Sequence, residues 1–253
     1  KVTGGKHHEV VRTLSNALAD TDHPLHSLVA SLSADTGRTT DAPFVAIDLG
    51  TTGQGQLYEV SAVEAGPGTQ GRSFSLMLNP EGAHDLKKVP REMLEQQPRA
   101  RETARALRDF IGERPVVAYG GDAKKLDTVF DAAGTEALAT GQAVNAATVA
   151  QDALGLKRAP KLDRVARGFG LQMPGREQTG THINLEDALA LIQFRDSDAL
   201  RERLMPRVQQ AAKDAAGTYR TEDAMAGPNP DTGPEPNPET GLQYKAPEGA
   251  PGG

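Results

Sequence analysis

A continuous apolar run at 44–49, FVAIDL, most constrains what this chain can fold into. The run has the length of a β-strand and is followed at once by a second strand-like segment. Continuous apolar runs of this length are typical of a central strand that is buried on both faces of a sheet. We therefore expect a layered α/β domain with this strand at its centre.

The segments that follow alternate between strand-like and helix-like patterns. Further strands are predicted at 56–65, 72–80 and 114–121. Helices are predicted at 98–112, 123–133, 145–154, 161–169, 185–195 and 198–216. Three adjacent strands followed by a helix, a strand and more helices predict a mixed β-sheet flanked by helices.

Composition divides the chain further. Residues 1–41 carry a weak amphipathic pattern and predict a short helical N-terminal extension. Residues 42–205 form the main domain in this interpretation, and 206–217 complete its last helix. Residues 218–253 are rich in Pro and Gly and have few apolar side chains, so they predict a disordered tail. Such a tail fits either a linker to further domains of a longer polypeptide or a plain C-terminus.

Several protein classes are disfavoured by composition. The chain has no cysteine, so disulfides and thiolate metal sites are excluded, and its net charge of −6 argues against a protein that coats nucleic acid. No apolar run approaches ~18 residues, so we expect no membrane partner. The chain begins at Lys1 without a signal-peptide pattern, so we expect a fragment or processed product and a cytoplasmic location.

The segment IDLGTTG, at 47–53, has two interpretations. It resembles the phosphate-binding turn of the actin, Hsp70 and sugar-kinase ATPases, which is a short motif. That family needs a second phosphate loop and an adenosine-binding Gly-Gly much later in the chain, and AYGGDAKK at 118–125 matches either poorly. The same segment also resembles the first motif of the DEDDh 3′–5′ exonucleases.

Four further segments resemble the DEDDh exonucleases, which include the proofreading subunit of bacterial DNA polymerase III, in the family's own order. They are SFSLMLNP at 73–80, VPREMLEQQPRARETARALRDFIGERPVVAYGGD at 89–122, PKLDRVARGFGL at 160–171 and THINLEDALALIQF at 181–194. The last contains the family's His-x4-Asp pattern. The resemblance covers roughly 42–195 and implies an RNase H-like fold.

The resemblance also implies a catalytic site. Asp48 and Asp187 would bind two Mg²⁺ or Mn²⁺ ions, which prefer oxygen ligands, and His182 would act as the general base. The substrate would be a nucleic-acid 3′ end, of DNA or RNA. Plainer roles remain open: Asp48 could cap a turn, His182 could be an exposed loop residue, and Asp187 could form a helix N-terminal capping pattern with Asn184.

Two positions depart from the family pattern. Gly50 stands where the first motif has a glutamate, so one metal ligand is missing. In the second motif, an ungapped alignment places Lys124 at the ligand position, whereas a gapped alignment places Asp122 there. We therefore expect either an attenuated metal-dependent exonuclease or an inactive exonuclease-like domain that serves as a binding or structural module. In the first case, Gly50→Glu should raise the rate.

A group of basic residues could contact phosphates near the site. Six basic residues between 157 and 176 accompany one acid, Asp163; they are Lys157, Arg158, Lys161, Arg164, Arg167 and Arg176. The group predicts either a positive rim for nucleic acid or an ordinary solvated helix face.

Overall fold

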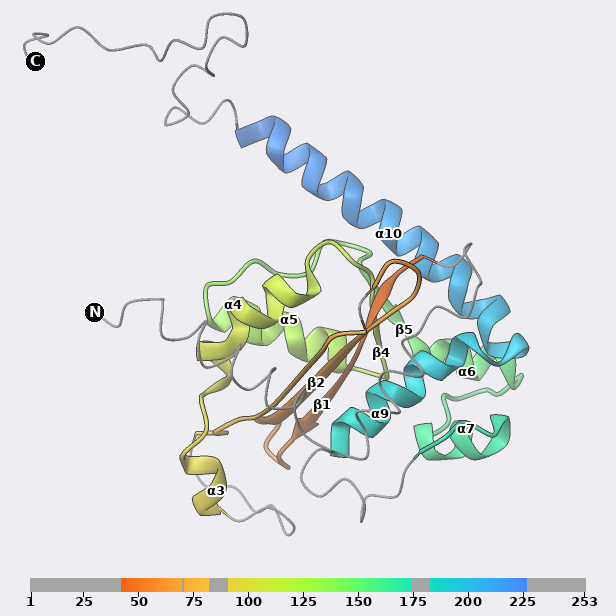
Figure 1. The fold of residues 1–253 in the computed structure, drawn as a ribbon, viewed down its shortest axis with the longest axis horizontal. Helices are drawn as coiled ribbons and strands as arrows, with labels where there is room; N and C mark the ends of the chain where they lie inside the picture. The colour runs from red at the N-terminus through yellow and green to blue at the C-terminus, as the bar shows by residue number, and fades with distance from the viewer. Residues whose placement is uncertain (1–41, 70, 82–90, 174–182, 227–253) are drawn as a thin grey trace, which may run out of the picture.

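The computed structural model describes residues 42–69, 71–81, 91–173 and 183–226. Over these ranges the chain forms one β-sheet with helices packed on its two faces (Figure 1). The predicted N-terminal extension, His182 and the chain beyond Ala226 lie outside the described residues.

The sheet has five strands in the order β3-β2-β1-β4-β5. Their bounds are β1 Phe44–Thr51, β2 Leu57–Ala65, β3 Ser73–Met77, β4 Val116–Ala118 and β5 Ala143–Asn145. β2 runs antiparallel to β1 and β3, while β1, β4 and β5 are parallel. This confirms the predicted mixed β-sheet flanked by helices. β5 was not predicted, because only the middle one of its three residues, Val144, is buried, whereas the equally short β4 is three buried apolar residues.

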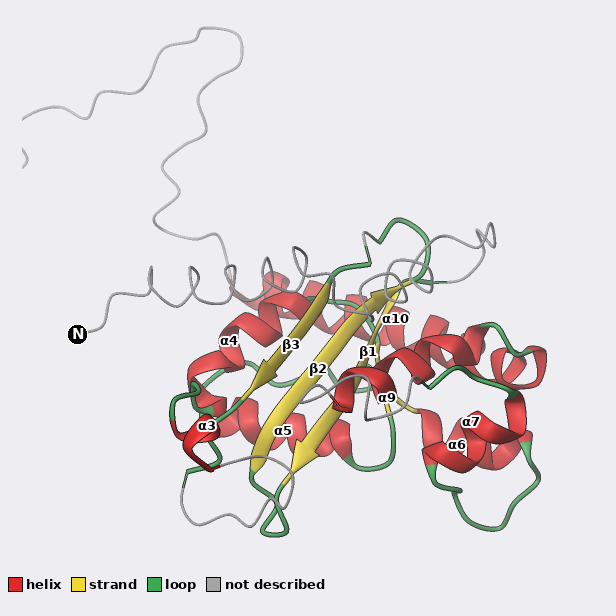
Figure 2. Cartoon of the chain, turned by 60° about the horizontal axis from the view of Figure 1, so that its bottom comes forward, coloured by secondary structure: helices red, strands yellow, loops and turns green. Residues whose placement is uncertain are grey.

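Helices cover both faces of the sheet (Figure 2). Their bounds are α3 Arg91–Glu95, α4 Ala100–Ile111, α5 Asp122–Ala132, α6 Ala146–Ala153, α7 Leu162–Phe169, α9 Ile183–Ile192 and α10 Asp198–Ala226, with a short 3₁₀ helix at Gln193–Arg195. α4 and α5 pack on one face, and α6, α9 and α10 pack on the other.

The side chains of β1 alternate between these two layers, as successive residues of a strand must. Phe44 and Ala46 belong to the core beneath α9, whereas Val45 and Ile47 belong to the core beneath α4 and α5. Both sets are buried, which confirms that β1 is a central strand. By the same alternation, Asp48 and Gly50 lie on the α9 face.

Most helix boundaries differ by one or two residues from the prediction, and two of the differences change an expectation. α9 begins at Ile183 rather than at 185, so Asn184 belongs to its first turn and is not the residue before it. α10 continues to Ala226 although it contains Pro206, so the predicted start of the disordered tail near Thr218 was too early. No helix in the described part of the chain is long and apolar enough to cross a membrane.

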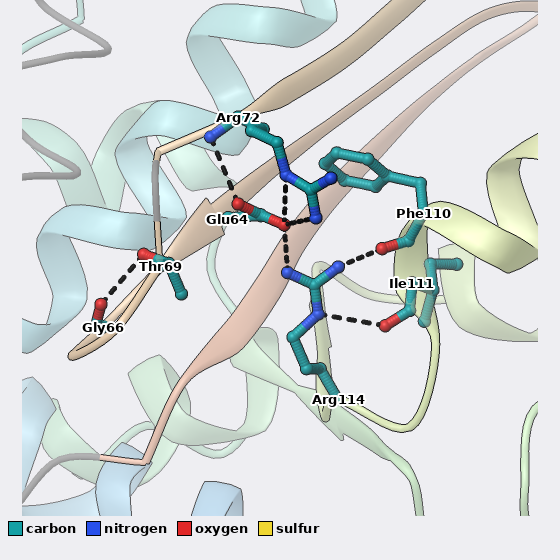
Figure 3. A network of polar contacts seen from close by, with 7 residues as sticks. All are labelled: Glu64, Gly66, Thr69, Arg72, Phe110, Ile111 and Arg114. Carbon is teal, nitrogen blue, oxygen red and sulfur yellow. Dashed lines mark hydrogen bonds and ion pairs between the residues drawn. The ribbon is translucent and has the colours of Figure 1, made fainter.

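A charged network joins the β2–β3 hairpin to the end of α4 (Figure 3). The buried Glu64 carboxylate accepts hydrogen bonds from Arg72 Nε at 3.0 Å and from Arg114 Nη1. Arg114 Nε also donates to the Ile111 carbonyl at 3.1 Å, and both guanidinium groups lie over the Phe110 ring. Burial alone would raise the pKa of Glu64, but the two guanidinium groups outweigh it, so the pKa is lowered.

We expect Glu64→Gln to lower the free energy of unfolding by about 2 kcal/mol, because hydrogen bonds to a buried charged group are lost. The lowered pKa stabilises the fold above the pKa of an unfolded glutamate and loses this effect as the pH falls through the folded value. The difference between wild type and Glu64→Gln should therefore shrink below about pH 4. Urea denaturation measures it, with the exposed Glu113→Gln as control; an unchanged free energy for Glu64→Gln would contradict the prediction.

Candidate active site

Three elements meet at the carboxyl end of β1. Asp48 lies near that end, α5 begins just after the parallel neighbour β4, and the first turn of α9 crosses the same end of the sheet (Figure 2). The carboxyl ends of parallel strands are the usual place for a site in α/β proteins, because the following loops and helix starts converge there. The acidic residues predicted from the sequence come from these three elements.

Asp48 and Asp122 are in direct contact. Asp48 is 8% exposed, Asp122 is buried as well, and their carboxyl groups lie close enough to interact. Burial and the charges of Asp187 and Asp122 together raise the pKa of Asp48 well above its usual range.

Asp187 belongs to the same cluster. It lies on α9 and interacts electrostatically with both Asp48 and Glu59. The structure thus brings together three predicted residues, Asp48, Asp122 and Asp187. It cannot place the fourth, His182, which lies just outside the described residues before α9.

Asp122, not Lys124, faces the cluster. Asp122 opens α5 and is buried, whereas the side chain of Lys124 is exposed on the outer side of the helix. Lys125 forms an ion pair with one member of the cluster, because its ammonium group lies 2.9 Å from Asp122 Oδ1. The gapped alignment of the second motif therefore agrees with the positions of these side chains.

Glu59 is a member of the cluster that the sequence analysis missed. It lies on β2 directly opposite Gly50 and is 0% exposed. Burial raises the pKa of Glu59 to about 8, and the charge of Asp187 adds to this, while a hydrogen bond from the Asn184 backbone acts the other way. The available signal was an acidic residue on the same side of the strand as the apolar Val63 and Ala65, where charges are rare.

The space beside Gly50 is already filled. A Cβ atom at this position would overlap the Asn184 carboxamide and would lie 2.8 Å from Cζ of Tyr58. Gly50→Glu would therefore require the Asn184 carboxamide and the Tyr58 ring to move, and the higher rate expected of this variant stays a prediction. The plainer role proposed for Asn184, a helix cap, was wrong, because its side chain turns toward β1.

The chemistry of the cluster fits a divalent cation. Four carboxyl groups supply only oxygen donors, which Mg²⁺ and Mn²⁺ prefer, and the burial of Asp48, Glu59 and Asp122 makes simultaneous ionisation costly without a cation. Among the described residues, however, no three acidic or histidine side chains already converge as a metal-binding group. The carboxyl groups lie near one another, but Asp122 is paired with Lys125 and Asp48 is hydrogen-bonded to Asn184.

The basic residues near α7 are solvent-exposed. Lys157, Arg158, Lys161, Arg164 and Arg167 all have exposed side chains, and Arg176 lies outside the described residues. The segment is tied to the end of β4 by Tyr119, whose hydroxyl donates to the Pro160 carbonyl at 2.5 Å.

We expect Gly50→Ala to lower the free energy of unfolding by about 1–3 kcal/mol, because its methyl group must displace the Tyr58 ring and the Asn184 amide. Gly53→Ala is a matched control, since a Cβ at Gly53 meets nothing within 4 Å. Thermal and urea denaturation of both variants test this. Equal stability of the two would show that the space beside Gly50 can open freely.

We expect Glu59→Gln to change how stability depends on pH. A carboxyl group whose pKa is raised on folding binds more protons in the folded chain, so stability falls as pH rises from about 4.5 to about 8. One such group changes the free energy of unfolding by up to about 1.4 kcal/mol per pH unit in that window. Denaturation in the presence of a chelator should show a shallower decline for Glu59→Gln; an identical decline would mean that Glu59 is ionised in the folded chain.

Comparisons with known proteins give little beyond this geometry. No protein-family model matches the chain, and no curated protein matches it. Among solved structures, the chain is similar to exonuclease X in complex with 5′ overhanging duplex DNA, with 15% sequence identity and a TM-score of 0.44. The similar region covers 65% of this chain and 99% of that chain. We therefore base the functional proposal on the residues of the carboxylate cluster.

Proposed function

We propose that this chain is a metal-dependent 3′–5′ exonuclease domain with an attenuated rate, acting on nucleic-acid 3′ ends. The observation that carries the proposal is the meeting of Asp48, Asp122 and Asp187 beside the buried Glu59. A site of this kind is costly to keep for stability alone, because buried like charges repel one another. The 3′–5′ direction and the substrate class come from the resemblance of the sequence motifs.

In this proposal Asp48, Asp122 and Asp187 hold two Mg²⁺ or Mn²⁺ ions. The ions would supply a water of lowered pKa and stabilise the charge on the leaving oxygen. His182 would take the proton of the attacking water, whose oxygen forms the new bond to phosphorus as the bond to the 3′ oxygen breaks. The exposed basic residues Lys157, Arg158, Lys161, Arg164 and Arg167 would attract the phosphate backbone.

Three features support a reduced rate. Gly50 supplies no ligand, Lys125 is paired with Asp122, and the Asn184 side chain fills the place beside Gly50. Changing groups that orient metal ligands typically reduces metal affinity or activity by roughly 10–100-fold, and we expect a missing ligand to cost at least as much. An enzyme that keeps most of the carboxylates but lacks one should therefore be slow rather than silent.

A second candidate is an exonuclease-like domain without catalysis that acts as a binding or structural module. The observation in its favour is the ion pair between Lys125 and Asp122, which offsets part of the negative charge of the cluster from within the chain. Further domains of a longer polypeptide would then be the partners of such a module.

We expect the protein to shorten a 5′-labelled single-stranded oligonucleotide from its 3′ end in Mn²⁺ or Mg²⁺, slowly and one nucleotide at a time. Asp187→Ala should lower the rate by about 100-fold or more, because it removes a proposed metal ligand. A time course with DNA and RNA oligonucleotides, resolved on a denaturing gel, measures this. Excess EDTA should stop the reaction.

Asp163→Ala is the matched control, because it removes an exposed aspartate of α7 outside the cluster. It should retain the wild-type rate. Equal rates for wild type and Asp187→Ala would contradict the catalytic proposal. Binding of the same oligonucleotide without cleavage, measured by fluorescence anisotropy, would then favour the module.

A further inference from the structure

The place of the missing glutamate is occupied by another side chain. Gly50 is the cross-strand neighbour of Glu59, and the strand register shifts immediately after Gly50. An atom added to Gly50 as Cβ would overlap the Asn184 carboxamide. Asn184 comes from α9, so the group beside Gly50 is supplied by a different element of the fold.

The Asn184 carboxamide makes two complementary contacts. With its nitrogen facing Asp48, Nδ2 donates to Asp48 Oδ2 at 3.2 Å and Oδ1 accepts from the Gly50 backbone N–H at 2.6 Å. The reverse orientation would face oxygen to oxygen and N–H to N–H, so hydrogen bonding selects the first. The side chain is 6% exposed and therefore exchanges few bonds with water.

The backbone of Asn184 is held at the same point. Its N–H donates to Glu59 Oε1 at 3.3 Å, so the first turn of α9 is fixed to β2 as well as to β1. Asp187 lies about one turn further along α9. The contacts of Asn184 therefore set how the acidic groups of α9, β1 and β2 face one another.

We propose that Asn184 is a positioning residue that takes the place of the missing acidic ligand and links Asp48 of β1 to the helix that carries Asp187. This inference rests on the proposed metal-dependent function. Asn184 preserves the hydrogen bonds and shape of the site but contributes one negative charge fewer than a carboxylate would. Gly50 is then required by Asn184, and the missing charge can be returned at position 184 without new atoms at position 50.

Two substitutions at position 184 test this in the full chain. Asn184→Asp has nearly the same shape; one oxygen still accepts from Gly50 N–H while the other faces Asp48 as an added anion. We expect it to bind Mn²⁺ about 10-fold more tightly than wild type, and to have a lower Tm in chelator that Mn²⁺ restores. Asn184→Ala should bind Mn²⁺ about 10-fold more weakly, because Asp48 loses the group that orients it.

Isothermal titration calorimetry with Mn²⁺ measures the affinities, and circular dichroism with and without Mn²⁺ measures Tm. Gln209→Glu is the charge-matched control on the exposed side of α10, and it should titrate like wild type. If Asn184→Asp is unfolded in chelator, Mn²⁺ should restore its fold; failure to do so overturns the inference. So does an Asn184→Asp protein that binds Mn²⁺ no more tightly than wild type.

The two proposals fail in different ways. Tighter Mn²⁺ binding by Asn184→Asp, beside a wild type that neither binds Mn²⁺ nor cleaves oligonucleotides, supports the role of Asn184 and overturns the exonuclease proposal for the natural chain. If the wild type cleaves oligonucleotides and substitutions at position 184 leave the Mn²⁺ affinity unchanged, the exonuclease proposal is supported and the role of Asn184 is overturned. Absence of Mn²⁺ binding in every variant overturns both.

Discussion

The burial of one carboxyl group, that of Asp48, is the constraint on which the rest of this site depends. Asp48 lies near the end of a strand that helices cover on both faces, so water cannot solvate its charge. A buried carboxylate must be protonated, paired or bound to a cation. The Asp48 carboxyl group lies beside that of Asp122 and accepts a hydrogen bond from the Asn184 amide. Because these groups come from α5 and α9, the packing of two helices on the sheet is tied to the charge of one side chain.

The buried carboxyl groups at the two ends of the β1–β2 pair have different surroundings. At one end, Glu64 lies between two guanidinium groups that hold its pKa low, so its charge is fully compensated by the fold. At the other end, the pKa values of Asp48 and Glu59 are raised, and Lys125 forms an ion pair with the neighbouring Asp122. The first arrangement is typical of a structural ion pair, and the second is typical of a site that works by binding a cation. This contrast separates the site from the rest of the polar interior.

Gly50 and Asn184 are best understood as a pair. A glycine at the end of a central strand leaves room, and an asparagine from a neighbouring helix uses it. In the exonuclease interpretation that we propose, Asn184 would put a neutral group where a charged one is expected, and it would keep hydrogen bonds to Asp48 and Gly50. A site that lacks one acid could stay ordered in this way. A neutral substitute would weaken metal binding, which fits an attenuated enzyme, and would stabilise the metal-free fold, which fits a module without catalysis.

The sequence by itself determined the elements of the sheet and the chemical character of the site. The apolar run at 44–49 marked β1, and alternating patterns marked β2 and the helices, because side-chain periodicity is a local property. Asp48 and Asp187 were also recognisable from motif order, which left Asp122 and Lys124 as alternatives. Only the tertiary structure decided that Glu59 joins them, that Asp122 rather than Lys124 faces them, and that Asn184 fills the space beside Gly50. These facts depend on strand register and on the packing of α9 across the sheet, which join residues distant in the chain and leave no local pattern in it.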